Sequence, residues 1–170
     1  MLGFKVFTSE LAHAAGYRTH NTGPYHAGPA ADNAHAGVAG DTIVKMEARV
    51  ANDVAPFFPS YIVIHAGTNG IAQPVDLHVE QYIALLSVLH DAAPSVRGIV
   101  LVEIPERVNR LAEVAAFNAR LPQVAAASPW GPDATRLVYP HVVLADLFDG
   151  AHPNDIGHHK IAEAVWHEGL

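Results

Sequence analysis

The chain of 170 residues contains no cysteine. A disulfide framework, a thiolate nucleophile and a cysteine-ligated zinc site are therefore all excluded. The absence also removes the usual indication of redox compartment, so the sequence leaves the cellular location unknown.

Charged residues are scarce as well. They make up 16% of the chain, compared with about 25% in an average soluble domain. Acidic residues outnumber basic ones by 17 to 10, which gives a net charge of −7, and there is no basic run. We expect no nucleic-acid surface on such a chain. Half of the residues are apolar, so we expect residues 1–170 to form a single compact domain with a substantial core.

Long apolar runs are also missing. No stretch approaches the roughly 18 apolar residues of a membrane span. The first residues contain neither a basic segment nor a following apolar segment of the kind found in signal peptides. We therefore expect no membrane interaction, although a segment preceding Met1 would reopen the question of secretion.

The apolar residues present follow the alternation of an α/β domain. Two runs, 61–66 and 98–104, are apolar apart from His65 and Glu103, which is typical of strands covered on both faces of a parallel sheet. Helical spacing and turn signals around these runs predict helices at 4–15, 41–52, 74–91, 109–127 and after 155, and strands at 17–21 and 137–144. This order predicts a three-layer α/β domain.

The chemistry is concentrated near the carboxyl terminus, in the sequence DGAHPNDIGHHKIAEAVW of residues 149–166. Asp149 and His152 lie three residues apart on a turn, and Asn154 or Asp155 can cap the helix that follows. The expected apolar face of that helix consists of Ile156, Ile161, Ala162, Val165 and Trp166. A carboxylate beside an imidazole can hold its tautomer and stabilise the imidazolium, as in nucleophile–base–acid triads.

Three motifs resemble a known family. GVAGDT at 37–42, HAGTN at 65–69 and DGAHPNDIGHHKIAEA at 149–164 are similar to the second, third and fifth sequence blocks of the SGNH/GDSL hydrolases. The likeness is greatest to carbohydrate-acetyl-esterase-like members and extends from about Gly3 to the last helix. It implies a flavodoxin-like fold and hydrolysis of a small ester or an acetylated carbohydrate, without cofactor or metal.

The resemblance also implies a role for each matching residue. His152 would be the general base and Asp149 would orient it, while the Asn69 amide and the Gly40 N–H would stabilise the oxyanion. The simpler alternatives are capping groups for His152 and Asp149, a turn residue for Asn69 and a glycine at a helix start for Gly40. Gly70 stands where the family usually has aspartate.

One block of the family is absent. The strand followed by Gly-Asp-Ser, whose serine is the nucleophile, should precede Gly3, and the chain begins at Met1. Ser9 is a local alternative, but the helical spacing of residues 4–15 places it on a polar helix face. We therefore expect an N-terminally truncated chain that is inactive as it stands. The alternative is a non-catalytic remnant that binds a glycan or a protein.

The missing block would also leave the sheet incomplete, because the family's first strand lies between the second and third in the order 2-1-3-4-5. We expect a gap beside strand 61–66, a shifted strand 17–21, or self-association of two chains through the unpaired sheet edge.

Twelve histidines raise the question of a metal site. The densest group is His152, Asp155, His158 and His159. Adjacent helical residues such as His158 and His159 point about 100° apart, so we expect no metal site there. His65, on an apolar strand, is expected in the core or on the floor of the site.

Overall fold

The computed structural model of the chain describes residues 11–16, 20–26 and 34–170. Its main sheet has three parallel strands in the order β3-β4-β5, with β3 at Tyr61–Ile64, β4 at Gly98–Val102 and β5 at Thr135–Val138. Ile62 lies opposite Ile99, and Val100 lies opposite Arg136. The structure therefore has the parallel sheet that the continuous apolar runs predict.

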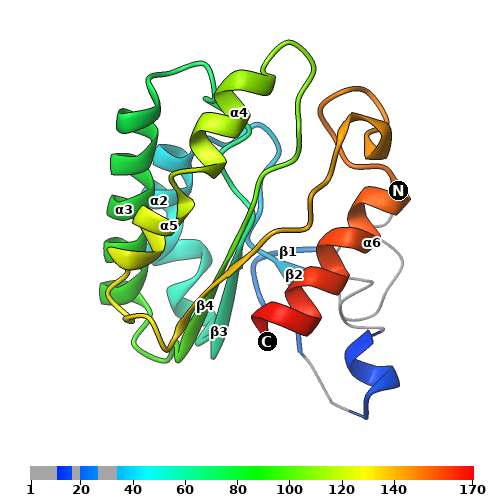
Figure 1. Cartoon of the computed structure of the whole chain (residues 1–170). Coiled ribbons are helices and arrows are strands. Elements are labelled where there is room, and N and C mark those ends of the chain that lie inside the picture. The colour runs from blue at the N-terminus through cyan, green and yellow to red at the C-terminus, as the bar shows by residue number, and fades with distance from the viewer. Residues whose placement is uncertain (1–10, 17–19, 27–33) are drawn as a thin grey trace.

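Helices cover both faces of this sheet (Figure 1). On one side lie α2, α3, α4 and α5, with bounds Ile43–Asp53, Val75–Ala92, Leu111–Asn118 and Leu121–Ala126. On the other lies α6, Asp155–Ala164, which continues into a π-helix at Val165–Gly169. Short 3-10 helices occupy Ala55–Phe57 and Leu144–Asp146. The α/β architecture with helices on both faces is confirmed.

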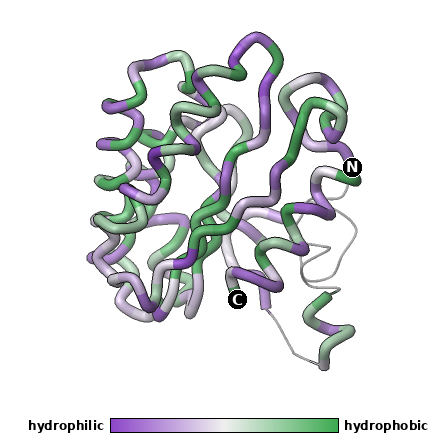
Figure 2. Tube along the Cα trace, viewed as in Figure 1, coloured by the Kyte–Doolittle hydropathy of each residue, from purple (hydrophilic) through white to green (hydrophobic). Residues whose placement is uncertain are grey.

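Alternate residues of the strands point into two separate cores. Ile64, Ile99 and Leu101 pack with α2 to α5, whereas Val100, Val102 and Val138 pack with α6 and the π-helix. All five residues of β4 are buried, and Figure 2 shows the hydrophobic central strands between the helices. Full burial of one such aliphatic side chain contributes about 1.5–3 kcal/mol, so the buried strand residues stabilise the fold together with the helices that cover them.

Several boundaries differ from the sequence predictions. The last strand ends at Val138 and does not reach residue 144. Pro140 has no N–H to donate to a ladder, and the apolar residues after it form a loop and the 3-10 helix at Leu144–Asp146. The predicted helix 109–127 is two helices, α4 and α5, and Pro122 lies in the first turn of α5.

The segments before residue 43 agree with the predictions in part. Residues 11–14 are helical and Gly16 has a φ of +84°, as expected for the end of helix 4–15. Most of predicted strand 17–21 lies outside the described residues, as does Ser9. Between predicted strand 17–21 and predicted helix 41–52, where the sequence predicts no helix or strand, lies a small antiparallel pair, β1 at Tyr25–His26 with β2 at Ala34–His35.

The last helix begins as the sequence predicts. Asn154 is the N-cap, and its side-chain oxygen accepts a hydrogen bond from the Gly157 N–H at 3.1 Å. Ile161, Ala162 and Val165 are buried, but Ile156 is 62% exposed, so its assignment to the apolar face was wrong. The face is set by Gly157, where an added Cβ would lie only 2.6 Å from the Asp146 carbonyl oxygen. That close approach turns Ile156 toward solvent.

One edge of β3 has no pairing partner among the described residues, since β3 pairs only with β4. The described order β3-β4-β5 matches the last three strands of the expected order. No helix in the described part of the chain is long and apolar enough to cross a membrane.

Candidate active site

Asp149 and His152 lie on the loop between the 3-10 helix at Leu144–Asp146 and α6, and they are joined directly. The His152 Nδ1 and the Asp149 Oδ2 are 2.7 Å apart. The Asp149 Oδ1 also accepts hydrogen bonds from the backbone N–H groups of His152, at 2.8 Å, and Ala151, at 3.0 Å. These bonds, led by the one from the His152 side chain, lower the pKa of Asp149 to about 2. The carboxylate is thus ionised and fixed in orientation.

The imidazole of His152 remains open on its other side. Its side chain is 72% exposed, compared with 39% for Asp149. Because Nδ1 is bound to the carboxylate, Nε2 is the nitrogen that can exchange a proton with a bound molecule. The turn itself is closed by a 2.9 Å bond from the Phe148 N–H to the His152 carbonyl and by Gly150 at a φ of +80°.

Asn69 and Gly40 come from two other segments that meet at a single hydrogen bond. The Asn69 Nδ2 donates to the backbone carbonyl of Asp41 at 3.0 Å. Gly40 directly precedes Asp41 and has a φ of +79°, which a residue with a side chain rarely adopts. The turn before α2 and the turn after β3 therefore form one unit.

Arg49 of α2 holds this unit in place. Its Nη2 and Nε lie 2.5 Å and 3.0 Å from the Asp41 Oδ2, and its Nη1 donates to Asp53. The same Nη2 reaches the Ala36 carbonyl at 3.2 Å. The side chains of Asp41 and Asp53 are only 12% and 13% exposed, so solvent screens these ion pairs less than it screens surface pairs.

The segment after β4 joins the two halves of the site. The Arg107 Nη1 donates to the Thr68 carbonyl at 2.8 Å, and the N–H of the next residue, Val108, donates to the Gly150 carbonyl at 2.8 Å. Thr68 precedes Asn69, and Gly150 follows Asp149. The asparagine turn and the Asp149–His152 turn are therefore fixed to consecutive residues, at the carboxyl edge of the sheet where open α/β folds bind ligands.

Two histidines lie beneath these turns. His65 directly follows β3, and burial lowers its pKa to about 4, with a further contribution from His158 of α6. Burial lowers the pKa of His158 as well. Neutral imidazoles fit the expectation that His65 is a core or floor residue. Among the described residues no group of three or more histidine, aspartate or glutamate side chains is placed to hold a metal ion.

No serine of the described segments belongs to this site. Ser60 and Ser95 precede β3 and β4, and Ser128 accepts a 2.7 Å hydrogen bond from Thr135 at the start of β5. These three lie toward the amino edge, opposite the site, and Ser87 is exposed on α3. A serine nucleophile would have to come from residues outside the described ranges.

The sequence identified the Asp149–His152 pair and the turns at Gly40 and Asn69, and the structure connects each of them as described. It did not single out Arg49, Asp41 as its partner, or Arg107. A local signal could have indicated the ion pairs of Arg49. Asp41 and Asp53 lie on either side of it in the sequence, and Asp53 is four residues further along the same helix. The contacts of Arg107 span 39 residues and have no such signal.

Comparisons with known proteins relate the chain to one family model and to several solved structures. A family model described as GDSL-like Lipase/Acylhydrolase matches residues 9–160. No curated protein matches the chain. A carbohydrate esterase family 3 structure from Talaromyces cellulolyticus is similar over 97% of this chain and 88% of its own, with a TM-score of 0.85 and 19% identity.

Two further structures show the same fold. A Clostridium thermocellum family 3 carbohydrate esterase has a TM-score of 0.79 and 20% identity, over 97% of this chain and 84% of its own. A variant of an acetyl xylan esterase from Geobacillus stearothermophilus has a TM-score of 0.68 and 21% identity, over 96% of this chain and 79% of its own. At these identities the likeness is one of fold.

Proposed function

Because the chain belongs to the GDSL-like lipase/acylhydrolase family, we propose that the site built on Asp149 and His152 hydrolyses an ester. The observation that carries this proposal is the 2.7 Å hydrogen bond between the His152 Nδ1 and an ionised Asp149. It leaves the exposed Nε2 of His152 as a general base, oriented by a carboxylate.

The reaction proceeds in two halves. A serine hydroxyl attacks the ester carbonyl while the His152 Nε2 accepts the hydroxyl proton, and Asp149 stabilises the imidazolium that forms. Collapse of the tetrahedral intermediate releases the alcohol, which receives that proton. Water, deprotonated by His152, then attacks the acyl-enzyme and releases the carboxylic acid and the serine. The protein residues suffice for every proton transfer.

Asn69 and Gly40 stabilise the negative oxygen of each intermediate. An asparagine amide has two N–H groups, and the bond to the Asp41 carbonyl uses one of them, so the second can donate to the substrate. The Gly40 N–H is the other donor. Losing one such donor typically costs about 3–4 kcal/mol of transition-state stabilisation.

In this proposal residues 1–170 do not supply the serine nucleophile, so the 170-residue chain alone is inactive. A second candidate follows from the same observation, because a chain without a nucleophile at this site would bind a glycan or a protein without hydrolysing it.

The proposed substrate is an acetyl ester of a carbohydrate or a similar small alcohol. Support comes from the solved structures with the same fold, which are carbohydrate and acetyl xylan esterases. The exposed His152 also suits an ester carried on a large, soluble alcohol, since the alcohol can remain outside the protein.

A nucleophile supplied at the amino end tests the proposal. The chain is extended with a strand ending in Gly-Asp-Ser from a family 3 carbohydrate esterase, and acetate release from acetylated xylo-oligosaccharides is measured. We expect turnover that is lost when the added serine is changed to alanine and in His152→Ala. A cooperatively folded extended chain that binds the oligosaccharide without turnover would instead establish the binding function. Turnover that survives His152→Ala would refute the proposed base.

A further inference from the structure

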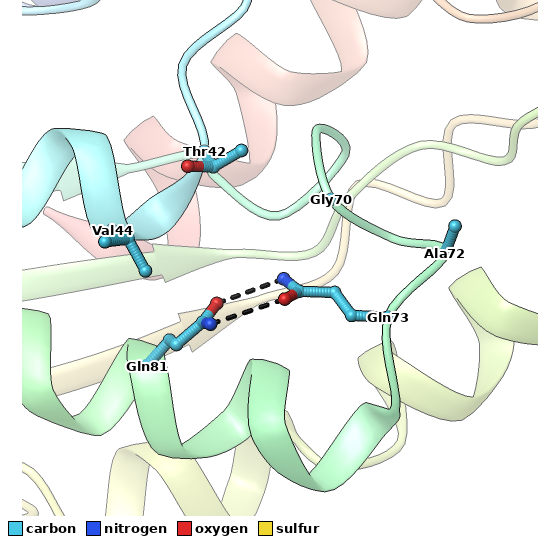
Figure 3. A pocket seen from close by; sticks show the side chains of 6 residues that line it. All are labelled: Thr42, Val44, Gly70, Ala72, Gln73 and Gln81. Atoms are coloured by element: carbon cyan, nitrogen blue, oxygen red, sulfur yellow. Dashed lines mark hydrogen bonds between the residues drawn. The ribbon is translucent and has the colours of Figure 1, made fainter.

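A pocket lies directly beside the proposed oxyanion donors. It has a volume of about 400 Å³ and opens between the start of α2, the turn after β3 and α3 (Figure 3). Its size is within the roughly 300–1,000 Å³ range of small-molecule sites. The lining residues are Thr42, Val44, Gly70, Ala72, Gln73 and Gln81. None of them carries a charge, so the pocket offers no counter-ion to an acidic or basic ligand.

Two facing amides form its polar wall. The Gln73 Nε2 donates to the Gln81 Oε1 at 3.0 Å, and the Gln81 Nε2 donates to the Gln73 Oε1 at 3.3 Å. Figure 3 shows the two side chains reaching toward each other from the turn and from α3. Each amide has two N–H groups and two acceptor positions, and the reciprocal pair uses one of each. The pair is thereby held rigid while each amide keeps a donor and an acceptor for a ligand.

Gly70 keeps the pocket open. Its φ is +90°, and a Cβ at this position would lie 2.9 Å from the Gln73 Nε2 and 3.7 Å from the Thr42 Cγ2. Any side chain at position 70 would therefore displace the glutamine pair or fill the space in front of it. The neutral amide wall depends on the glycine.

The position of the pocket links it to the reacting centre. Gly70 follows Asn69, and Thr42 follows Asp41, the two residues joined by the 3.0 Å hydrogen bond between amide and carbonyl. Gly70 is thus one residue from Asn69, and Thr42 is two residues from Gly40, the two groups that would hold the oxyanion. A ligand group in this pocket would be attached to the reacting ester through only a short linkage.

We propose that the pocket between Gly70, Gln73 and Gln81 binds an uncharged, hydroxyl-rich group, namely a sugar ring of the ester's alcohol. Vicinal hydroxyls match the paired donors and acceptors of the two amides, and Val44 and Ala72 contact the C–H face of the ring. This inference rests on the proposed function and adds to it the part of the site that recognises the alcohol.

The test measures binding, so it does not need a nucleophile. Xylotriose is titrated into the ¹⁵N-labelled 170-residue chain, and the side-chain amide signals of Gln73 and Gln81 are identified by their loss in Gln73→Ala and Gln81→Ala. We expect both signals to shift and saturate. Each alanine variant should bind about three- to tenfold more weakly, as expected for loss of a neutral hydrogen bond. The control is Gln123→Ala, which removes a glutamine of α5 bonded to Arg120 and should leave the affinity unchanged.

A second variant distinguishes loss of the ligand contacts from unfolding of the protein. Gly70→Ala should abolish the xylotriose shifts while the backbone amide spectrum outside residues 68–82 stays native. Unshifted glutamine signals, or shifts produced by 1-hexanol and not by xylotriose, would overturn the proposal, and the second result would identify an acyl-chain pocket. If the glutamine signals shift and saturate with xylotriose but ester hydrolysis is unchanged in His152→Ala, the proposed function is refuted and the sugar site is supported. If hydrolysis is lost in His152→Ala but the glutamine signals do not shift with xylotriose, the proposed function is supported and the sugar site is refuted.

Discussion

Asn69 and Asp41, 28 residues apart, are joined by a 3.0 Å hydrogen bond from a side-chain amide to a backbone carbonyl. The carboxylate of the same aspartate is held by Arg49. The orientation of the Asn69 amide therefore depends on a residue of α2 that lies outside the turn, and the turn carrying Gly40 depends on it too. Arg49 acts as a positioning residue for both proposed oxyanion donors.

Replacing Arg49 by alanine should weaken both the fold and this turn. The change leaves Asp41 and Asp53 without their shared cation in a half-buried setting, and loss of charged hydrogen bonds of this kind costs about 1.5–3 kcal/mol. Urea unfolding should show a loss of about 2–3 kcal/mol, with partial recovery in Arg49→Lys. Hydrogen exchange should accelerate at residues 36–42. Arg110→Ala, which breaks an exposed pair with Glu113, is the control and should cost under about 1 kcal/mol.

Asp149 makes a pH-dependent contribution to stability with a definite sign. Its pKa falls from 3.8 to about 2 in the folded chain, mainly because of the His152 side chain. A depressed carboxyl pKa stabilises the fold above the unfolded value, and the stabilisation is lost as the pH falls from about 4 to about 2. The difference in unfolding free energy between the natural chain and Asp149→Asn should therefore shrink across this window. A difference that stays constant from pH 6 to pH 2 would mean that the carboxylate is not hydrogen-bonded as described.

Esterase assays of the unmodified chain should give a negative result. With p-nitrophenyl acetate, the 170-residue protein should be no faster than His152→Ala, since a triad without its serine retains only about 10³–10⁴-fold catalysis over water. Ser9→Ala is the informative companion. Clear turnover that this substitution abolishes would make Ser9 the nucleophile.

The free edge of β3 should make the chain associate. No strand of the described residues pairs with the edge of β3 that faces away from β4. Each buried polar group without a partner costs about 1–3 kcal/mol, compared with about 5–15 kcal/mol for the stability of a whole domain. Light scattering coupled to size-exclusion chromatography should show a mass that rises with concentration. A monodisperse monomer with a cooperative melt would contradict this expectation.

The sequence predicted the elements whose pattern is local and strong. Helix 74–91 and strand 98–104 were expected within two residues of the observed α3 and β4, because long periodic or continuous apolar runs leave few alternatives. The last strand was misjudged, since Val142 to Leu144 continue its apolar pattern beyond Pro140. That pattern reflects packing of Val142 against α6 and not strand pairing.

In the candidate site, too, only the contacts between residues close in sequence could be predicted. Asp149 and His152 are three residues apart, so their contact is settled by a single turn. The bonds of Arg107 to Thr68, and of Val108 to Gly150, join segments about 40 residues apart. Such contacts depend on how the strands and helices are assembled, and no spacing in the sequence indicates them.

The Arg107–Val108 dipeptide has a consequence for how the protein can change over evolution. Neighbouring Cα atoms are only 3.8 Å apart, so the proposed base and the proposed oxyanion donors are both positioned by one peptide unit. Substitutions at the pocket residues Gly70, Gln73 and Gln81 would alter what the proposed pocket recognises without changing the spacing on which the chemistry depends. An insertion between Arg107 and Val108 would separate the two halves of the site, so new substrates should arise through the pocket and not through this peptide unit.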